Sequence, residues 1–434
     1  MLPKRAGLTN ASFKVLSSGL NFLLVPLYIH VYGVATYGAL SLLLSLGQYL
    51  SVLDVGLTGS LVQERVRVHA SGDYSYFQHR TLAIGFLFVV GGGATLVAAA
   101  TARWWGPAVG LKEVAGLRLA VLAAGWLAVF PLVSSCMNSA YVATMRFGHV
   151  NLYNLSLNIL PQLTAAASYA WSSSLGFSLT AAAIVGLVVL GIQAMIVRVE
   201  ERTLRQAAPD RRASARFFLK SSITFSLQSL LGALLMPLLQ TVVGMRFGIQ
   251  ANALVDVSRR LLFAARQALE ATFVPLFTRA TELHAADRTR QLRRLAFISI
   301  GASALGAVVF YLALGPLLET VLDAWLGVTI GSRVSPVAKI LLVGVAFTCP
   351  HIGVYQILSI TPGGRAINIA AAVGSLAVLS SAFFWDGASL QQVLWTYAAA
   401  TALGATITLT AASLHFKRFS MVVPDHQVAD AEVS

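Results

Sequence analysis

Residues 178–212 have the sequence SLTAAAIVGLVVLGIQAMIVRVEERTLRQAAPDRR, and this stretch decides the class of fold. Residues 178–197 carry no charge, and about 20 apolar residues are what a helix needs to cross the hydrocarbon core of a bilayer. The rest of the stretch is crowded with arginine and glutamate, so the apolar run ends at a membrane surface. The stretch therefore predicts one membrane span followed by a polar loop.

The same pattern recurs along the chain. Backbone groups in lipid are satisfied only inside helices or closed barrels, and the composition, 57% hydrophobic and 11% charged, differs strongly from that of a soluble domain. We therefore predict an all-α membrane protein with about 12 transmembrane helices. The predicted spans are 12–31, 36–57, 82–101, 117–137, 150–171, 178–197, 220–243, 254–277, 295–315, 336–358, 366–385 and 391–414.

The net charge of +14 is unevenly distributed. If the spans alternate in direction, most lysines and arginines fall on one side, and the positive-inside rule places that side and both termini in the cytoplasm. Such a surface suits anionic phospholipids, which attract basic residues close to the membrane. We expect these lipids, and not nucleic acid, as its partner, and a location in the inner (plasma) membrane.

The polar loop divides the chain into two halves of six spans. The predicted units are an N-terminal lobe (1–199), a basic cytoplasmic linker (200–219), a C-terminal lobe (220–416) and a cytoplasmic tail (417–434). Short motifs echo between the halves at an offset of about 211 to 216, for example Asp54-Val-Gly-Leu and Glu270-Ala-Thr-Phe. Two such parallel repeats, with a substrate site between them, are typical of transporters.

Nothing in the sequence points to catalysis, a metal or a cofactor. There is no HExxH, P-loop or CxxC motif, and Cys136 and Cys349 both fall in predicted spans. A membrane glycan polymerase or ligase typically has a large external loop, whereas the longest outer loops here, 102–116 and 316–335, are short. We therefore do not expect an enzyme.

The predicted span 254–277 carries a polar stripe within about a 120° arc at 100° per residue. A charge at the bilayer centre costs at least about 2.5–3.5 kcal/mol, so such residues face a cavity or a partner. The arginines of this stripe could hold phosphate bidentately, although the two near the helix end could simply snorkel to the interface. Pairing of Asp256 with Arg260, and of Arg266 with Glu270, is expected at i,i+4 spacing. The stripe consists of Asp256, Arg259, Arg260, Arg266, Gln267 and Glu270.

Two further stripes are largely uncharged. The first span aligns Asn10, Lys14, Ser17, Asn21 and Tyr28, and the span 150–171 aligns Asn151, Asn154, Asn158, Gln162 and Tyr169. These groups could bind sugar hydroxyls or form hydrogen bonds between helices. We take Lys14 and Asn21 as candidate cavity residues. Asp54, Asp256 and Glu270 are candidates for ion coupling or for charge pairs.

Two sets of motifs, one in each half of the chain, are distinctive. The first consists of Asn10, Pro26-Leu-Tyr, Val31-Tyr-Gly, Tyr37-Gly38 and Asp54-Val-Gly-Leu57, and the second of Val243-Gly-Met-Arg-Phe-Gly248, Ala253 and Arg259-Arg260. The first set resembles the opening of the Wzx-type polysaccharide flippases, and the second resembles the start of their second half. These flippases belong to the multidrug/oligosaccharidyl-lipid/polysaccharide (MOP) exporter superfamily. Two elements are missing: His30 replaces a frequent arginine, and Gln240 and Thr241 replace a common aspartate, so charge-pair roles are not carried over to these positions.

The resemblance implies a V-shaped pair of six-helix lobes around a central cavity that helices 1, 2, 7 and 8 line. It implies a lipid-linked oligosaccharide as cargo, on an undecaprenyl-pyrophosphate carrier in a bacterial inner membrane, moved by alternating access for surface polysaccharide synthesis. Coupling to H+ or Na+ and association with polymerase machinery are left open. The alternative is a MOP-fold exporter of drugs or of another lipid-linked precursor, for which an acidic cavity would be expected if the cargo is a cation.

Overall fold

The computed structural model describes residues 2–50, 56–71, 75–112, 114–144, 146–205, 215–285, 288–359, 361 and 363–422. Helices make up nearly all of this part of the chain. They are α1 (Leu2–Gln48), α2 (Leu57–Ser71), α3 (Ser75–Phe86), a π turn (Leu87–Gly91), α4 (Gly92–Trp105), a short 3-10 turn (Pro107–Val109), α5 (Leu117–Ala143), α6 (Phe147–Ser172), α7 (Leu175–Arg205), α8 (Ala215–Ala285), α9 (Thr289–Leu326), α10 (Val328–Leu358), α11 (Gly364–Ser381) and α12 (Leu390–Val422).

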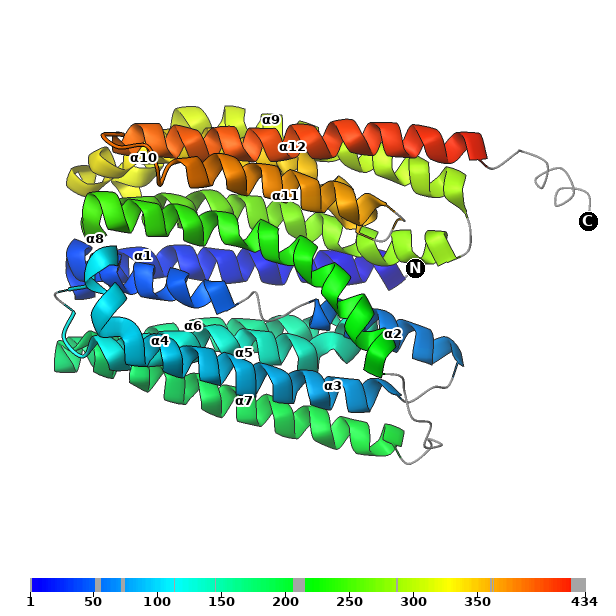
Figure 1. Ribbon diagram of the computed structural model, residues 1–434, viewed down its shortest axis with the longest axis horizontal. Coiled ribbons are helices and arrows are strands. Elements are labelled where there is room, and N and C mark those ends of the chain that lie inside the picture. Colours follow the sequence, from blue (N-terminus) through cyan, green and yellow to red (C-terminus); the bar gives the residue numbers. More distant parts are fainter. Residues whose placement is uncertain are drawn as a thin grey trace, which may run out of the picture.

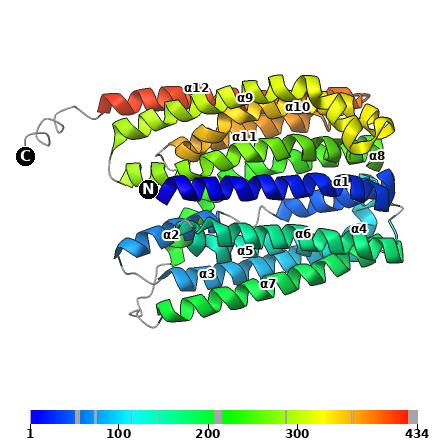
Figure 2. The ribbon, with the colours of Figure 1, turned by 180° about the vertical axis from the view of Figure 1, so that it is seen from behind.

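The helices form two lobes, as the sequence predicts. Figure 1 shows α2 to α7 on one side, α9 to α12 on the other, and α1 and α8 between them. The view from behind shows the same division (Figure 2). Helix α7 ends at Arg205 and helix α8 begins at Ala215, so both helices extend into the predicted linker 200–219.

Nine helical stretches in the described part of the chain are long and apolar enough to cross a membrane. Helix α6 falls outside this set, although we predicted a span there, because its amide side chains lower its mean hydropathy. The predicted first and second spans share α1, and the seventh and eighth share α8. The protein is therefore a multi-pass helical membrane protein.

Helices α1 and α8 are each folded into a hairpin at a glycine. Gly33 has φ 71°, ψ 161° and Gly248 has φ 80°, ψ 176°, a backbone region that is essentially restricted to glycine. Gln240 and Asp256 would be about 24 Å apart along a straight helix, but their side chains form a 3.1 Å hydrogen bond. We call the parts before and after each glycine the first and second limbs (2–32 and 34–48 of α1, 215–247 and 249–285 of α8). The two turns occupy equivalent places in the two halves, within the offset of the sequence repeat.

The lobes touch where the second limbs of α1 and α8 cross. A Cβ at Gly38 would overlap the carbonyl oxygen of Ile249, so only glycine allows this approach. Asn252 is fully buried beside it and donates to the Gly38 carbonyl (3.2 Å) and to Ser41 Oγ (2.8 Å). This contact fixes the register between the halves and thereby the position of the charged residues that follow on α8.

Replacing Gly248 with alanine is expected to lower the free energy of unfolding by about 1–3 kcal/mol, because the left-handed turn strains any residue with a Cβ. No atom of the described residues lies within 4 Å of the added Cβ, so the effect is expected to come from the backbone. Gly301→Ala is the matched control, since Gly301 has the same open surroundings inside α9. There alanine should be neutral or stabilising by up to about 1 kcal/mol. Melting temperatures in detergent test this, and equal shifts for the two variants would contradict it.

Candidate functional site

One buried carboxylate gathers the charged stripe of α8. Asp256 is 1% exposed and accepts hydrogen bonds from Tyr37 Oη (2.6 Å) and Gln240 Nε2 (3.1 Å). It also accepts from Arg259 Nη2 (2.6 Å) and Arg260 Nε (2.8 Å). The predicted pairing of Asp256 with Arg260 is confirmed, and Arg259 joins it at i,i+3.

The partners of Asp256 come from three segments: the second limb of α1, the first limb of α8 and the second limb of α8. They therefore join the two lobes as well as neutralising charge. Two guanidinium groups share one carboxylate, which leaves this cluster with one excess positive charge. The Arg260 guanidinium also lies over the Tyr37 ring, 5.9 Å from its centroid, a geometry that favours a cation.

A cavity of about 590 Å³ lies on the N-lobe side of this cluster, and we call it the N-lobe chamber. Its walls come from both limbs of α1, from α5, α6 and α7, and from the second limb of α8. Arg259, Arg260 and Gln267 line it on one side and Asn21 on the other. Four of the predicted cavity residues are thus brought together.

The amides of the N-lobe chamber bind one another. Tyr28 Oη donates to Gln162 Oε1 (2.9 Å), and Gln162 Nε2 donates to Asn21 Oδ1 (3.2 Å) and Asn158 Oδ1 (2.8 Å). The two uncharged stripes predicted from the sequence therefore meet. Of the two roles left open for them, the hydrogen bonds between helices are present in the structure.

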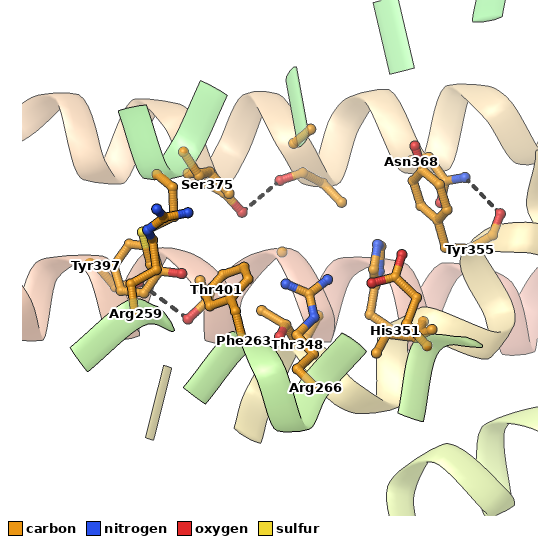
Figure 3. A pocket seen from close by; sticks show the side chains of 18 of the residues that line it. Arg259, Phe263, Arg266, Thr348, His351, Tyr355, Asn368, Ser375, Tyr397 and Thr401 are labelled. Carbon is orange, nitrogen blue, oxygen red and sulfur yellow. Dashed lines mark hydrogen bonds between the residues drawn. The ribbon is translucent and has the colours of Figure 1, made fainter. Parts of the chain in front are cut away.

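A second cavity of about 570 Å³ lies inside the C-terminal lobe, and we call it the C-lobe chamber. Helices α8, α10, α11 and α12 surround it. Figure 3 shows Arg266 of α8, His351 of α10, Asn368 of α11 and Tyr397 of α12 around the same space. Glu270 also lines it.

The two chambers are neighbours. Gln48, Arg259 and Phe263 line both of them, so the second limb of α8 is the partition. The stripe that the sequence predicts on α8 is therefore divided: Arg260 and Gln267 face the N-lobe chamber, and Arg266 and Glu270 face the C-lobe chamber.

The predicted pair of Arg266 with Glu270 is wrong. Both side chains are described, and no ion pair joins them; the Arg266 guanidinium lies 5.2 Å from the centroid of the Phe263 ring instead. A one-turn spacing permits an ion pair but does not require it, and the aromatic ring offers the cation a competing position.

Two predicted residues cannot be placed. The side chain of Lys14 and the whole of Asp54 lie outside the described residues. Other residues of the site have no distinctive spacing in the sequence. Tyr37 and Gln240 reach Asp256, and His351, Asn368 and Tyr397 reach the C-lobe chamber, only through the packing of distant segments.

No family model matches the chain, and no curated protein matches it in sequence. Solved structures match its fold over nearly its whole length. A multidrug resistance MATE family transporter of the MOP superfamily is similar in an outward-facing conformation (TM-score 0.67) and in an inward-facing one (TM-score 0.61). Both are 11% identical and cover 96% of this chain, which in turn covers 96% and 100% of theirs. This chain has the MOP transporter fold.

A MOP superfamily transporter from Pyrococcus furiosus is also similar, with a TM-score of 0.64 and 12% identity over 96% of this chain and 97% of its own. Its binding pocket is described as having reverse polarity, which suggests a different function for that protein. Polarity of the pocket therefore varies on this fold, and the charges of the two chambers here carry information that the fold alone does not.

Replacing Asp256 with asparagine is expected to lower the free energy of unfolding by about 3–5 kcal/mol, because Arg259 and Arg260, which are only 20% and 14% exposed, would lose their carboxylate. Glu319→Gln is the control, since this carboxylate pairs with Lys339 at 3.0 Å on the surface and is 60% exposed. There the change should stay below about 1 kcal/mol. Unfolding in detergent measures both, and an equally small effect at Asp256 would show that the cluster does not hold the lobes together.

Proposed function

We propose that this chain is a transporter that moves a lipid-linked oligosaccharide from the cytoplasmic to the periplasmic face of a bacterial inner membrane. The carrier would be undecaprenyl pyrophosphate, and the product would serve surface polysaccharide synthesis. The observation that carries the proposal is the excess of positive charge in the chambers. Three arginines face them, Arg259, Arg260 and Arg266, against the two carboxylates of Asp256 and Glu270.

An anionic headgroup suits this arrangement better than a cation does. Arginine binds phosphate oxygens through parallel N–H groups, and a charge inside a membrane protein favours a ligand of opposite sign. Arg260 has its Nε bound to Asp256. Among the described residues no carboxylate forms an ion pair with Arg266, which leaves its terminal N–H groups for a ligand, so we assign it the main contact with phosphate.

The placement of the lobe contacts supports alternating access. The Gly38–Ile249 contact lies near the two glycine turns, whereas the N-lobe chamber extends away from them. Asn21 and Gln267 are about 18 Å and about 28 Å from the turns along their helices. With the termini in the cytoplasm, the turns lie at the outer surface and the chambers extend toward the inner one, as loading of cargo from the cytoplasm requires.

Export of drugs is the second candidate, and the similarity to multidrug resistance MATE transporters favours it. Against it stands the positive charge of the chambers, which would repel cationic drugs. A neutral or anionic compound would meet no such barrier. The remaining expectations, contact with anionic phospholipids, coupling to H+ or Na+, and association with a polymerase, belong to the same proposal.

Arg266→Ala is expected to abolish surface polysaccharide in a complementation assay while the protein stays in the membrane. Arg266→Lys should recover little activity, because an ammonium cannot bind two phosphate oxygens side by side. Arg333→Ala is the control, since Arg333 is exposed at the start of α10 and lines neither chamber. Normal polysaccharide from Arg266→Ala would contradict the role of a cationic chamber.

Deleting the gene in its native host separates the two candidate functions. Under the proposal, complete lipid-linked repeat units accumulate in the carrier-lipid fraction and surface polysaccharide is lost. Under drug export, the lipid intermediates are normal and sensitivity to toxic compounds rises. Extraction and mass analysis of carrier-lipid glycans, beside growth on a panel of drugs, measures both.

A further inference from the structure

The C-lobe chamber presents polar groups that the protein itself does not use. Arg266, Glu270 and Tyr397 line it, and within the described part of the chain none of their charged or hydroxyl ends takes part in a hydrogen bond. Two buried atoms at its wall also lack a hydrogen-bond partner among the described residues: His351 Nδ1 and Asn368 Oδ1. An unsatisfied buried polar atom costs about 1–3 kcal/mol, so this wall is unfavourable when the chamber holds nothing polar.

These groups are of mixed character. Arg266 donates, the Glu270 carboxylate and Asn368 Oδ1 accept, and the Tyr397 hydroxyl does both. The Asn368 amide nitrogen is held by the Tyr355 carbonyl (3.3 Å), which directs its oxygen. The Tyr397 ring packs directly on α10, because a Cβ added at Gly344 would lie only 3.0 Å from it. This packing holds the Tyr397 hydroxyl in position.

With the phosphate of the cargo on Arg266, the remaining groups of this wall favour a neutral ligand. The Glu270 carboxylate repels a further anionic group, and the Arg266 guanidinium repels a cation. A neutral molecule rich in hydroxyl groups can bind to donors and acceptors alike, because each hydroxyl donates one hydrogen bond and accepts two. Tyr355, Tyr397 and Phe263 add apolar ring surface to the same wall.

The N-lobe chamber is the natural competitor for such a ligand, since it is richer in amides. There, however, Gln162 donates to Asn21 and to Asn158 and accepts from Tyr28. A sugar would have to break these hydrogen bonds to bind in the N-lobe chamber. In the C-lobe chamber it would form hydrogen bonds with groups that have no partner among the described residues.

We propose that the C-lobe chamber is a binding subsite for a neutral saccharide unit of the cargo, with Glu270, Asn368 and Tyr397 as its hydrogen-bonding residues. This inference rests on the proposed function and deepens it. Arg259 and Phe263 border both chambers, so a sugar can lie in the C-lobe chamber, with its phosphate on Arg266, while the lipid tail of the cargo stays outside it. Recognition of the sugar then belongs to the second half of the chain.

The test measures binding of two probes to the full-length protein in lipid nanodiscs. One is the undecaprenyl-pyrophosphate-linked glycan that accumulates in cells lacking the chain, and the other is undecaprenyl pyrophosphate without sugar. Wild type is expected to bind the glycan-bearing carrier at least about tenfold more tightly than the bare one, which corresponds to one or two net hydrogen bonds.

Tyr397→Phe and Glu270→Gln each keep the shape of the side chain and remove one hydrogen-bonding property. Each should lower the preference for the glycan-bearing carrier over the bare one about three- to tenfold. Loss of the Glu270 charge acts on the pyrophosphate of both probes alike, so it cancels in this ratio. Tyr311→Phe is the matched control, because Tyr311 is 45% exposed on α9 and lines neither chamber. It should change neither affinity.

The alternative outcomes are distinct. If both variants keep the full preference for the glycan-bearing carrier, the saccharide binds elsewhere and the inference is wrong. If they weaken both probes equally, Glu270 and Tyr397 act on the carrier's phosphates and not on its sugar, which also overturns the inference. If wild type binds neither probe, the proposed function itself fails.

Discussion

The structure depends on a single buried carboxylate. Asp256 accepts hydrogen bonds from both lobes at once and holds two arginines beside it. A lone buried charge is prohibitively unfavourable, and breaking such a pair leaves an uncompensated charge behind. Because the donors come from three segments, the carboxylate ties the positions of α1 and α8 to the electrostatics of the chambers. Movement of one lobe against the other must change the surroundings of Asp256, so this residue lies where conformation and charge are coupled.

Two glycine turns make that arrangement accessible to the chain. Gly33 and Gly248 fold α1 and α8 back on themselves, and Gly38 then allows the second limbs to approach to backbone contact. Each turn brings residues that are far apart along a helix to the same depth, as with Gln240 and Asp256. The two turns lie 215 residues apart, within the offset at which short motifs of the two halves echo each other, so the repeated turn and the sequence repeat point to the same duplication.

The sequence predicts well whatever depends on composition and helical period. Apolar length fixes the spans, the polar loop separates the halves, and the 3.6-residue period places Asp256, Arg259 and Arg260 on one face, where the structure finds them. Prediction from the sequence fails for side-chain partners, because these depend on which distant segments pack against each other. Nothing in the spacing of α8 distinguishes Arg260, which is bound to Asp256, from Arg266, which turns to Phe263. The low hydropathy of α6 has a related cause, since its Gln162 binds Tyr28 and Asn21 of α1, partners that a window of sequence does not contain.

That distinction between bound and unbound polar groups separates the two chambers. An amide or arginine near a cavity contributes to recognition only to the extent that the protein leaves its hydrogen bonds unmade, because a ligand must otherwise compete with an existing partner. By this criterion the amides around Gln162 are structural, although their composition resembles a sugar site. The polar groups around Tyr397 are fewer, but within the described residues they keep hydrogen-bonding capacity that a ligand can use. The same argument applies to charge. Asp256 reduces Arg259 and Arg260 to one net positive charge, so the chambers attract an anion less strongly than a count of basic residues in α8 implies. Arg266 gains importance because it lines a chamber and forms no ion pair with the described residues.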